Sequence, residues 1–178
     1  MVRRLLLLAL VLPLLQAAPA NGHASVLPSA SFEDQDGRQL DLAAMRGRVV
    51  VIVYGGRSAL AQHVAWGKRL DGDLRERGVY RPDEPPQTRS VQILALAQMG
   101  GIPEAFRSML RAMLRARVES GYSLWLDWDD RMSILFGAHE SVSTVVVADQ
   151  QGVVRLVVSG PPQGAPYRAV SALLRHLR

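Results

Sequence analysis

A short run of small and charged residues, Gly55-Gly56-Arg57-Ser58, separates a stretch of β-branched residues from an amphipathic segment. At such a strand-to-helix junction, free backbone N–H groups, the helix dipole and the Arg57 guanidinium could bind a small anion. The alternative is structural: the glycines allow a tight turn, Ser58 caps the helix and Arg57 points into solvent. The sequence leaves both interpretations open.

A serine and two histidines could supply a hydrolytic or metal site near this run. His63 lies five residues beyond Ser58, and His139 shortly precedes Ser143 at the start of a later predicted strand. Ser58 could act as a nucleophile with His63 or His139 as base, or the histidines could hold a metal. The Gly-x-Ser-x-Gly and His-x-x-x-His spacings are both absent, so we expect no catalytic residue, no metal and no cofactor.

Three aspartates, Asp127, Asp129 and Asp130, surround Trp128. Paired carboxylates can perform acid–base chemistry or bind a cation. The alternating acidic positions, central glycine and terminal glutamate of a calcium loop are not reproduced, so the pattern favours a strand end followed by an aspartate helix cap.

A second charged pattern is the basic row formed by Arg107, Arg111 and Arg115, which are spaced four residues apart. Such a row could dock an acidic partner or anionic lipid headgroups. The favoured alternative is the solvated face of an amphipathic helix, because the opposite stripe is needed for the core. That stripe comprises Phe106, Met109, Leu110, Met113, Leu114 and Val118.

Composition excludes several functions. The 178 residues include no cysteine, so thiol-dependent oxidoreductase or peroxidase activity is excluded. With 48% hydrophobic and 21% charged residues, the chain has the composition of a globular domain. The net charge of +5 is too small to indicate nucleic-acid binding.

The N-terminus has the features of a secretory signal. Arg3 and Arg4 precede the apolar run 5–15, and Ala18-Pro19-Ala20 supplies small residues for cleavage. We predict a signal peptide at residues 1–20, a flexible mature N-terminus at 21–30 and one domain at 31–178. The apolar run is too short to span a bilayer and no cysteine can carry a lipid. We therefore expect a periplasmic or secreted bacterial protein with no stable membrane anchor after cleavage.

The rest of the chain alternates predicted strands and helices. An Asp36-Gly37 turn joins two short strands as a hairpin, and the run 49–54 is typical of a strand covered on both faces. Predicted strands cover 32–34, 38–42, 49–54, 91–97, 124–127, 144–148 and 153–158, and predicted helices cover 58–78, 103–118, 131–136 and 167–177. Parallel crossovers followed by an antiparallel hairpin and a closing helix predict a thioredoxin-like α/β fold of three layers. Its central mixed sheet is extended by the N-terminal β-hairpin.

Several segments resemble the redoxin (AhpC/TSA-like) branch of the thioredoxin superfamily. The hairpin 32–42 and the strand that begins at Gly47-Arg48 resemble the first elements of peroxiredoxins and exported thiol-disulfide reductases. The hairpin 145–154 and the helix 167–177 are similar to their last elements. The resemblance implies a redox cysteine in the region of Arg57 to Ala61 and a cis-proline at Ser143, and both are missing here.

Gly56-Arg57-Ser58 further resembles the periplasmic YtfJ-type family, as do Gln87-Thr88, Ile102-Pro103, Phe106-Arg107-Ser108 and Glu140-Ser141 in the same order. We therefore expect an exported, non-catalytic binding or scaffold protein that uses the former active-site edge. The predicted binding residues are Gly55, Gly56, Arg57, Ser58, His139 and Ser143. The partner is an envelope protein or a small anionic ligand, and a cysteine-independent hydrolase that uses Ser58 with His63 or His139 is the alternative.

Overall fold

The sheet is built around β3 (Val49–Gly55), a strand whose seven residues are all buried. Its β-branched side chains suit a pleated surface that is covered on both faces. The structure, a computed structural model, describes residues 26–81, 83–118, 122–137 and 139–177. The predicted signal peptide and residues 21–25 of the predicted flexible N-terminus lie outside the described residues.

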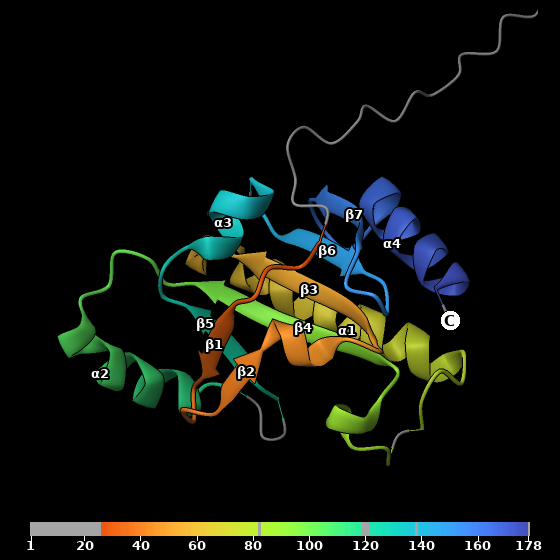
Figure 1. Ribbon diagram of the computed structural model, residues 1–178. Helices are drawn as coiled ribbons and strands as arrows, with labels where there is room; N and C mark the ends of the chain where they lie inside the picture. Colours follow the sequence, from red (N-terminus) through yellow and green to blue (C-terminus); the bar gives the residue numbers. More distant parts are fainter. Residues whose placement is uncertain (1–25, 82, 119–121, 138, 178) are drawn as a thin grey trace, which may run out of the picture.

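Seven strands form one mixed sheet in the order β2-β1-β5-β4-β3-β6-β7 (Figure 1). β3, β4 and β5 are parallel to one another, and the other neighbouring pairs are antiparallel. Besides β3, the strands are β1 (Ser31–Asp34), β2 (Gln39–Asp41), β4 (Val91–Gln98), β5 (Leu124–Asp127), β6 (Thr144–Ala148) and β7 (Val154–Ser159).

In the part of the chain that the structure describes, four α-helices and three short 3₁₀ helices accompany the strands. The α-helices are α1 (Leu60–Glu76), α2 (Glu104–Arg115), α3 (Arg131–Phe136) and α4 (Gly164–His176). The 3₁₀ helices are η1 (Leu42–Met45), η2 (Arg57–Ala59) and η3 (Pro86–Thr88). Among the described residues, no helix is both long enough and apolar enough to span a bilayer.

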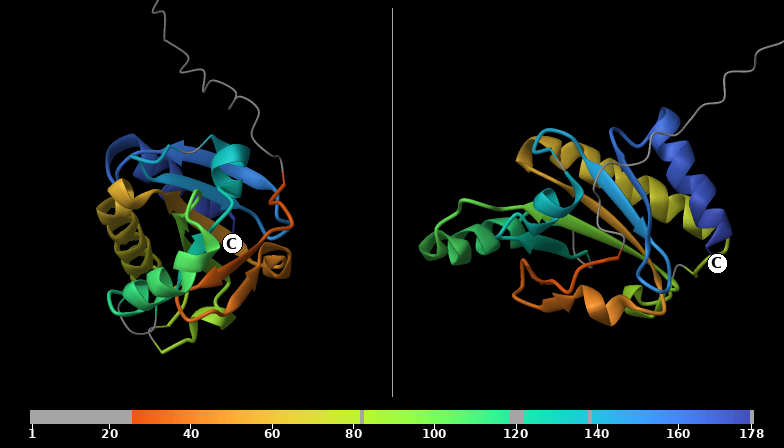
Figure 2. Two further views of the ribbon diagram at one scale, coloured as in Figure 1. Left: turned by 90° about the vertical axis from the view of Figure 1, so that its left-hand side faces the viewer. Right: turned by 45° about the horizontal axis from the view of Figure 1, so that its top comes forward.

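The alternation of side chains along β3 divides the core into two layers. Val49, Val51 and Val53 pack with α1 and α4 on one face. Val50, Ile52 and Tyr54 pack on the other face with α3 and η1. α2 covers the α1 side of β4 and β5, at the end of the sheet away from α4 (Figure 2). Helices on both faces of a central mixed sheet give the three layers that the sequence predicts.

The predicted hairpin is confirmed and forms the edge of the sheet. β1 pairs with β2 across a turn in which Gly37 has φ +81°, and β1 also pairs with β5. The buried Asp34 carboxylate accepts hydrogen bonds from the backbone N–H groups of Asp36 and Arg38, both at 2.9 Å. The residues before β1 run beside the start of β7, and the Leu27 N–H donates to the Gly152 carbonyl, just before β7, at 2.8 Å.

One prediction about side-chain placement is wrong. Of the apolar stripe predicted to face the core on α2, Leu110, Leu114 and Val118 are partly buried against β4 and β5. The other three members, Phe106, Met109 and Met113, are exposed. The apolar stripe is wider than the surface of β4 and β5 that α2 covers, and the arginines beside it face the β1–β2 hairpin.

Candidate functional site

The carboxyl end of β3 lies beside the segment that leads into β6. Because the two strands are antiparallel and Tyr54 pairs with Thr144, Gly55 ends β3 beside Ser143, which precedes β6. A Cβ atom on Gly55 would lie 3.2 Å from the Val142 carbonyl oxygen, which shows how closely the two segments approach. The topology thus places the predicted Gly55–Ser58 run and Ser143 at the same edge of the sheet.

Hydrogen bonds tie residues 139–143 to the start of α1. The Glu140 carbonyl oxygen accepts from the Gly56 N–H at 3.1 Å and from the Ser58 hydroxyl at 2.9 Å. The Ser143 N–H donates to Gln62 Oε1 at 3.3 Å. We call this arrangement, Gly55 to Ser58 with residues 139–143, the η2 edge. Ser58 does not cap α1, contrary to one of the two sequence interpretations, because Ala59 is the N-cap residue and makes no side-chain capping bond.

The two glycines of the η2 edge are required by close packing. A Cβ on Gly55 would lie 2.6 Å from His63 Nε2, and a Cβ on Gly56 would lie 2.6 Å from the Glu140 carbonyl oxygen. Gly56 has φ −81°, a value that any residue can adopt. Glycine is therefore needed here for the space that it leaves, whereas the sequence interpretation attributed it to a tight turn.

Beneath the glycines, His63 and Ser143 are buried and lack hydrogen-bond partners. His63 is 3% exposed and neither ring nitrogen has a partner among the described residues. Burial lowers the pKa of His63 to about 4, and the nearby Tyr54 carbonyl offsets part of that change. The Ser143 hydroxyl is likewise buried and unpartnered. His63 is therefore neutral at pH 7, and neither side chain can touch a ligand in solvent.

Three of the predicted binding residues do reach solvent. Arg57, Ser58 and His139 are exposed, whereas Gly55, Gly56 and Ser143 are buried. Arg57 has no ion pair among the described residues, so its charge is available at the surface. The edge therefore presents one guanidinium, one hydroxyl and one imidazole on a backbone that Glu140 holds in place.

The hydrogen bonds do not form a nucleophile–base pair. Ser58 donates its proton to a backbone carbonyl, and both His63 nitrogens are without partners in the described part of the chain. An activated serine needs its hydroxyl within hydrogen-bond reach of a base, about 2.6–3.2 Å. The geometry at this edge is thus suited to recognition more than to nucleophilic attack.

One member of the aspartate cluster, Asp127, binds the start of α3, so the helix-cap interpretation holds for that residue. Both oxygens of the buried Asp127 carboxylate accept from the first N–H groups of α3, those of Arg131 and Met132, at 3.1 and 2.9 Å. Asp130 accepts from the Gly100 N–H at 2.9 Å. No group of three potential metal ligands occurs among the described residues.

The prediction that the arginines of α2 form a solvated row holds for Arg115, which is exposed, and fails for Arg107 and Arg111, which are partly buried. Arg111 pairs with Glu33 at 2.7 Å and Arg115 pairs with Asp36 at 2.9 Å, both on the β1–β2 hairpin. The Arg107 guanidinium lies over the Trp128 ring, 5.0 Å from its centroid. Sequence reasoning missed the two ion pairs because Glu33 and Asp36 are more than 70 residues from their arginines, and no local spacing links the hairpin to α2.

The fold matches those of solved thioredoxin-like structures. A SCO1/SenC family lipoprotein from Bacillus anthracis superposes with a TM-score of 0.56 at 15% identity over 85% of this chain and 94% of its own. The exposed lipoprotein thioredoxin Etrx1 of Streptococcus pneumoniae gives 0.56 at 12% identity over 83% and 99%. A Chlorobium tepidum protein assigned as the thiol:disulfide interchange protein DsbE gives 0.57 at 16% identity over 88% and 98%.

The protein therefore has a thioredoxin-like fold, as the sequence predicts. No family model matches the chain, and no curated protein matches its sequence. At these identities the structural similarity establishes the fold alone. The chain itself contains no cysteine.

Proposed function

We propose that this chain is an exported, non-catalytic thioredoxin-like protein that uses the η2 edge for binding. The observation that carries the proposal is the exposed Arg57, which has no ion pair among the described residues and lies beside a loop fixed by two hydrogen bonds to Glu140. A guanidinium offers up to five N–H donors in a rigid planar arrangement that suits carboxylate and phosphate groups. The partner is accordingly an anionic group, carried by an envelope protein or by a small ligand.

Export and subfamily are part of the same proposal. The N-terminal charge and apolar pattern supports a signal peptide. The Gly56-Arg57-Ser58 motif supports membership of the YtfJ-type family, because the motif's backbone lies at the junction between β3 and α1. N-terminal sequencing of protein recovered from the periplasm should start at Asn21, whereas a start at Met1 would contradict cleavage.

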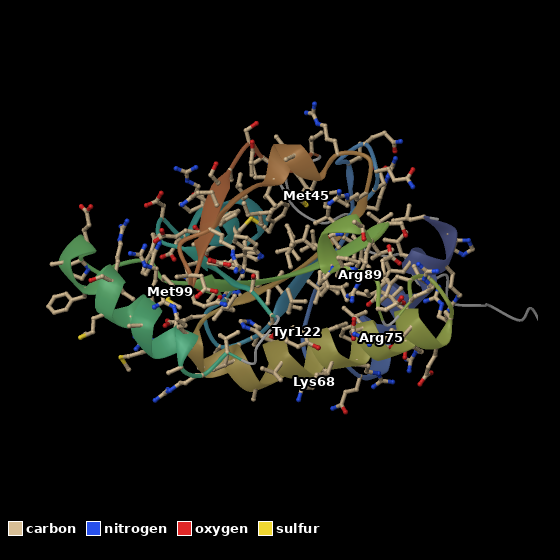
Figure 3. The ribbon with its side chains drawn as sticks, turned by 90° about the horizontal axis from the view of Figure 1, so that it is seen from below. Met45, Lys68, Arg75, Arg89, Met99 and Tyr122 are labelled. Carbon is tan, nitrogen blue, oxygen red and sulfur yellow. The ribbon has the colours of Figure 1, made fainter. Side chains whose placement is uncertain are left out.

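The binding role can be tested by photo-crosslinking in the native envelope. A benzophenone amino acid at His139 should give a discrete adduct, which should be lost when Arg57→Ala is added. The same probe at Lys68, which is exposed on α1 and points away from the sheet (Figure 3), should not give that adduct. Arg168→Ala removes an exposed arginine from α4 and is the matched control for lost charge.

Titration of the purified protein with inorganic phosphate tests a small anion in place of a protein partner. Heat of binding that disappears in Arg57→Ala would support an anion site at the η2 edge. Adducts that persist in Arg57→Ala, together with no heat from phosphate, would contradict the proposal.

The hydrolytic alternative makes a different prediction. If Ser58 were a nucleophile, Ser58→Ala would abolish ester hydrolysis by the purified protein and leave the crosslinked adduct intact. Loss of the Ser58–Glu140 hydrogen bond should instead only loosen the loop, so we expect a hydrolysis rate at the buffer background for both wild type and variant. A rate above background that requires Ser58 would establish the alternative.

A further inference from the structure

A second candidate site lies between α2, β1 and the segment that joins β5 to α3. It is a cleft of about 420 Å³, which is within the range of about 300–1,000 Å³ typical of small-molecule sites. We call it the α2 cleft. It shares no residue with the η2 edge. Figure 3 shows α2 at the far end of the molecule, with Met99 next to it where β4 leads towards the helix.

One wall of the α2 cleft is held rigidly by Glu33. One of its carboxylate oxygens accepts from Trp128 Nε1 at 2.7 Å, and the other accepts from Arg111 Nη1 at 2.7 Å. Both groups are partly buried, so these charge-assisted bonds are stronger than exposed ones. The Trp128 ring is thereby fixed, and the Arg107 guanidinium lies over it at 5.0 Å.

The charges that line the cleft are paired, with two exceptions. Glu33 is paired with Arg111, Asp129 with Arg131 at 3.2 Å, and Asp127 is occupied by the amides of α3. Arg107 has no hydrogen bond or ion pair with any described residue, and its Nε is buried without a partner. Glu104 also lines the cleft and makes no ion pair within the described ranges. One cation and one carboxylate are therefore available to a ligand.

The spacing of these two groups indicates the kind of ligand. Glu104 and Arg107 are three residues apart on α2, so they lie on the same face of the helix with Cβ atoms about 5–6 Å apart. A purely anionic ligand would be repelled by Glu104, and a purely cationic one by Arg107. A ligand that carries an ammonium group close to a carboxylate is attracted by both side chains and can orient each charge away from the like one.

We propose that the α2 cleft binds a free α-amino acid, with its carboxylate on Arg107 and its ammonium group on Glu104. The cleft is also lined by Ser31, Gln39 and Ser108, so it suits a polar side chain. The proposal is independent of the function proposed for the η2 edge, because the two sites use different residues.

The test follows the indole N–H resonance of Trp128 by NMR in the purified mature protein. L-Glutamine, and a panel of the other common amino acids, should shift this resonance saturably in the millimolar range. Succinate and ethylamine, which each carry one sign of charge, should produce no saturable shift. No shift with any amino acid, or equal binding of succinate, would overturn the proposal.

Two variants of the cleft separate binding from folding. Glu104→Gln removes an exposed carboxylate that makes no ion pair with any described residue, so its free spectrum should match that of wild type, and it should bind the amino acid about tenfold more weakly. Arg107→Gln should lose at least as much affinity. Arg57→Ala, at the η2 edge, is the matched control and should bind as wild type does. Unchanged affinity in both cleft variants would overturn the assignment.

Discussion

At the scale of single residues, the η2 edge depends on two glycines that have no Cβ atom. Gly55 and Gly56 lack the side chains that would meet His63 and Glu140, and the loop before β6 can therefore approach β3 closely. The close approach allows the Glu140 carbonyl to accept both hydrogen bonds that fix the loop. The position of Arg57 thus depends on the neighbouring Gly56.

Replacing Gly56 with alanine should destabilise the protein. The new Cβ would lie 2.4 Å from Glu140 Cγ and 2.6 Å from its carbonyl oxygen, so the backbone of the loop must move. We expect a loss of about 1–3 kcal/mol in the free energy of unfolding, measured in urea. Gly72→Ala is the control: it lies inside α1 with nothing within 4 Å of the added Cβ. That change should raise stability by about 0.5–1 kcal/mol.

His63 should make stability depend on pH. Its pKa is lowered from 6.5 to about 4 in the folded protein by burial. The unfolded chain therefore binds a proton more readily, so the contribution of His63 to stability is complete above about pH 6.5 and is lost as the pH falls towards 4. The loss is of the order of 3 kcal/mol.

Urea unfolding at several pH values between 7 and 4 measures this dependence. His63→Leu should flatten the decline in stability over this range. His139→Leu, which removes an exposed histidine, should keep the decline of wild type. The interpretation would be wrong if the His63→Leu curve followed wild type.

At the scale of elements, α2 shows where hydrophobic periodicity is insufficient. Its apolar residues form one broad stripe, and periodicity alone cannot decide which edge of that stripe faces the sheet. Ion pairs with Glu33 and Asp36 hold Arg111 and Arg115 against the hairpin and so set the rotation of the helix. Leu110 and Leu114 then meet β4 and β5, and Met109 and Met113 are left in solvent.

Neighbouring residues on α2 provide a direct test of this orientation. Met113 is 47% exposed, so Met113→Ala should change the free energy of unfolding by less than about 0.5 kcal/mol. Leu114 packs against the cluster around Leu126, so Leu114→Ala should cost about 1–3 kcal/mol. Thermal and urea unfolding of the two variants would reveal the opposite order if the helix were rotated.

The sequence predicts the elements better than the contacts between them. The buried run of β3 and the Asp36-Gly37 turn carry local signals, and the structure has a strand and a turn there. The proximity of Gly56 to the segment before β6 also follows, because topology alone brings these positions together. The sequence does not predict Glu140 as a residue of the binding edge, because its contribution is a backbone carbonyl that any residue could provide. The partners of Arg107 and Arg111 depend on contacts between distant segments, which no sequence spacing records.

At the scale of the whole molecule, α4 closes the α1 side of the sheet through a small number of specific contacts. Trp66 is fully buried on α1 and its indole N–H donates to the Gly160 carbonyl at 2.9 Å, just before α4. The Trp66 and Tyr167 rings lie 5.9 Å apart, and the Tyr167 hydroxyl donates to Asp73. The C-terminal helix and the loop before it are therefore attached to α1 by the Trp66–Tyr167 aromatic pair, by the Arg69 guanidinium over the Tyr167 ring, and by three hydrogen bonds, the third from Arg69 Nη1 to the Pro162 carbonyl at 2.8 Å.

Because of this attachment, we expect Trp66 to contribute more to stability than Trp125 does. Trp66→Phe removes the donor to Gly160 and leaves a small cavity between α1 and α4, so the free energy of unfolding should fall by about 2–3 kcal/mol. Trp125→Phe is the matched control, because Trp125 is only partly buried on the opposite face of the sheet. Its effect should be about 1 kcal/mol or less.

Hydrogen exchange locates the difference between the two variants. The amides of α4 should lose protection in Trp66→Phe before those of β3 do, because β3 is covered on both faces and α4 depends on its contacts with α1 and β7. Equal loss of protection throughout the protein would mean that α4 and the sheet unfold as one unit. In that case the connection through Trp66 would not be a separable part of the fold.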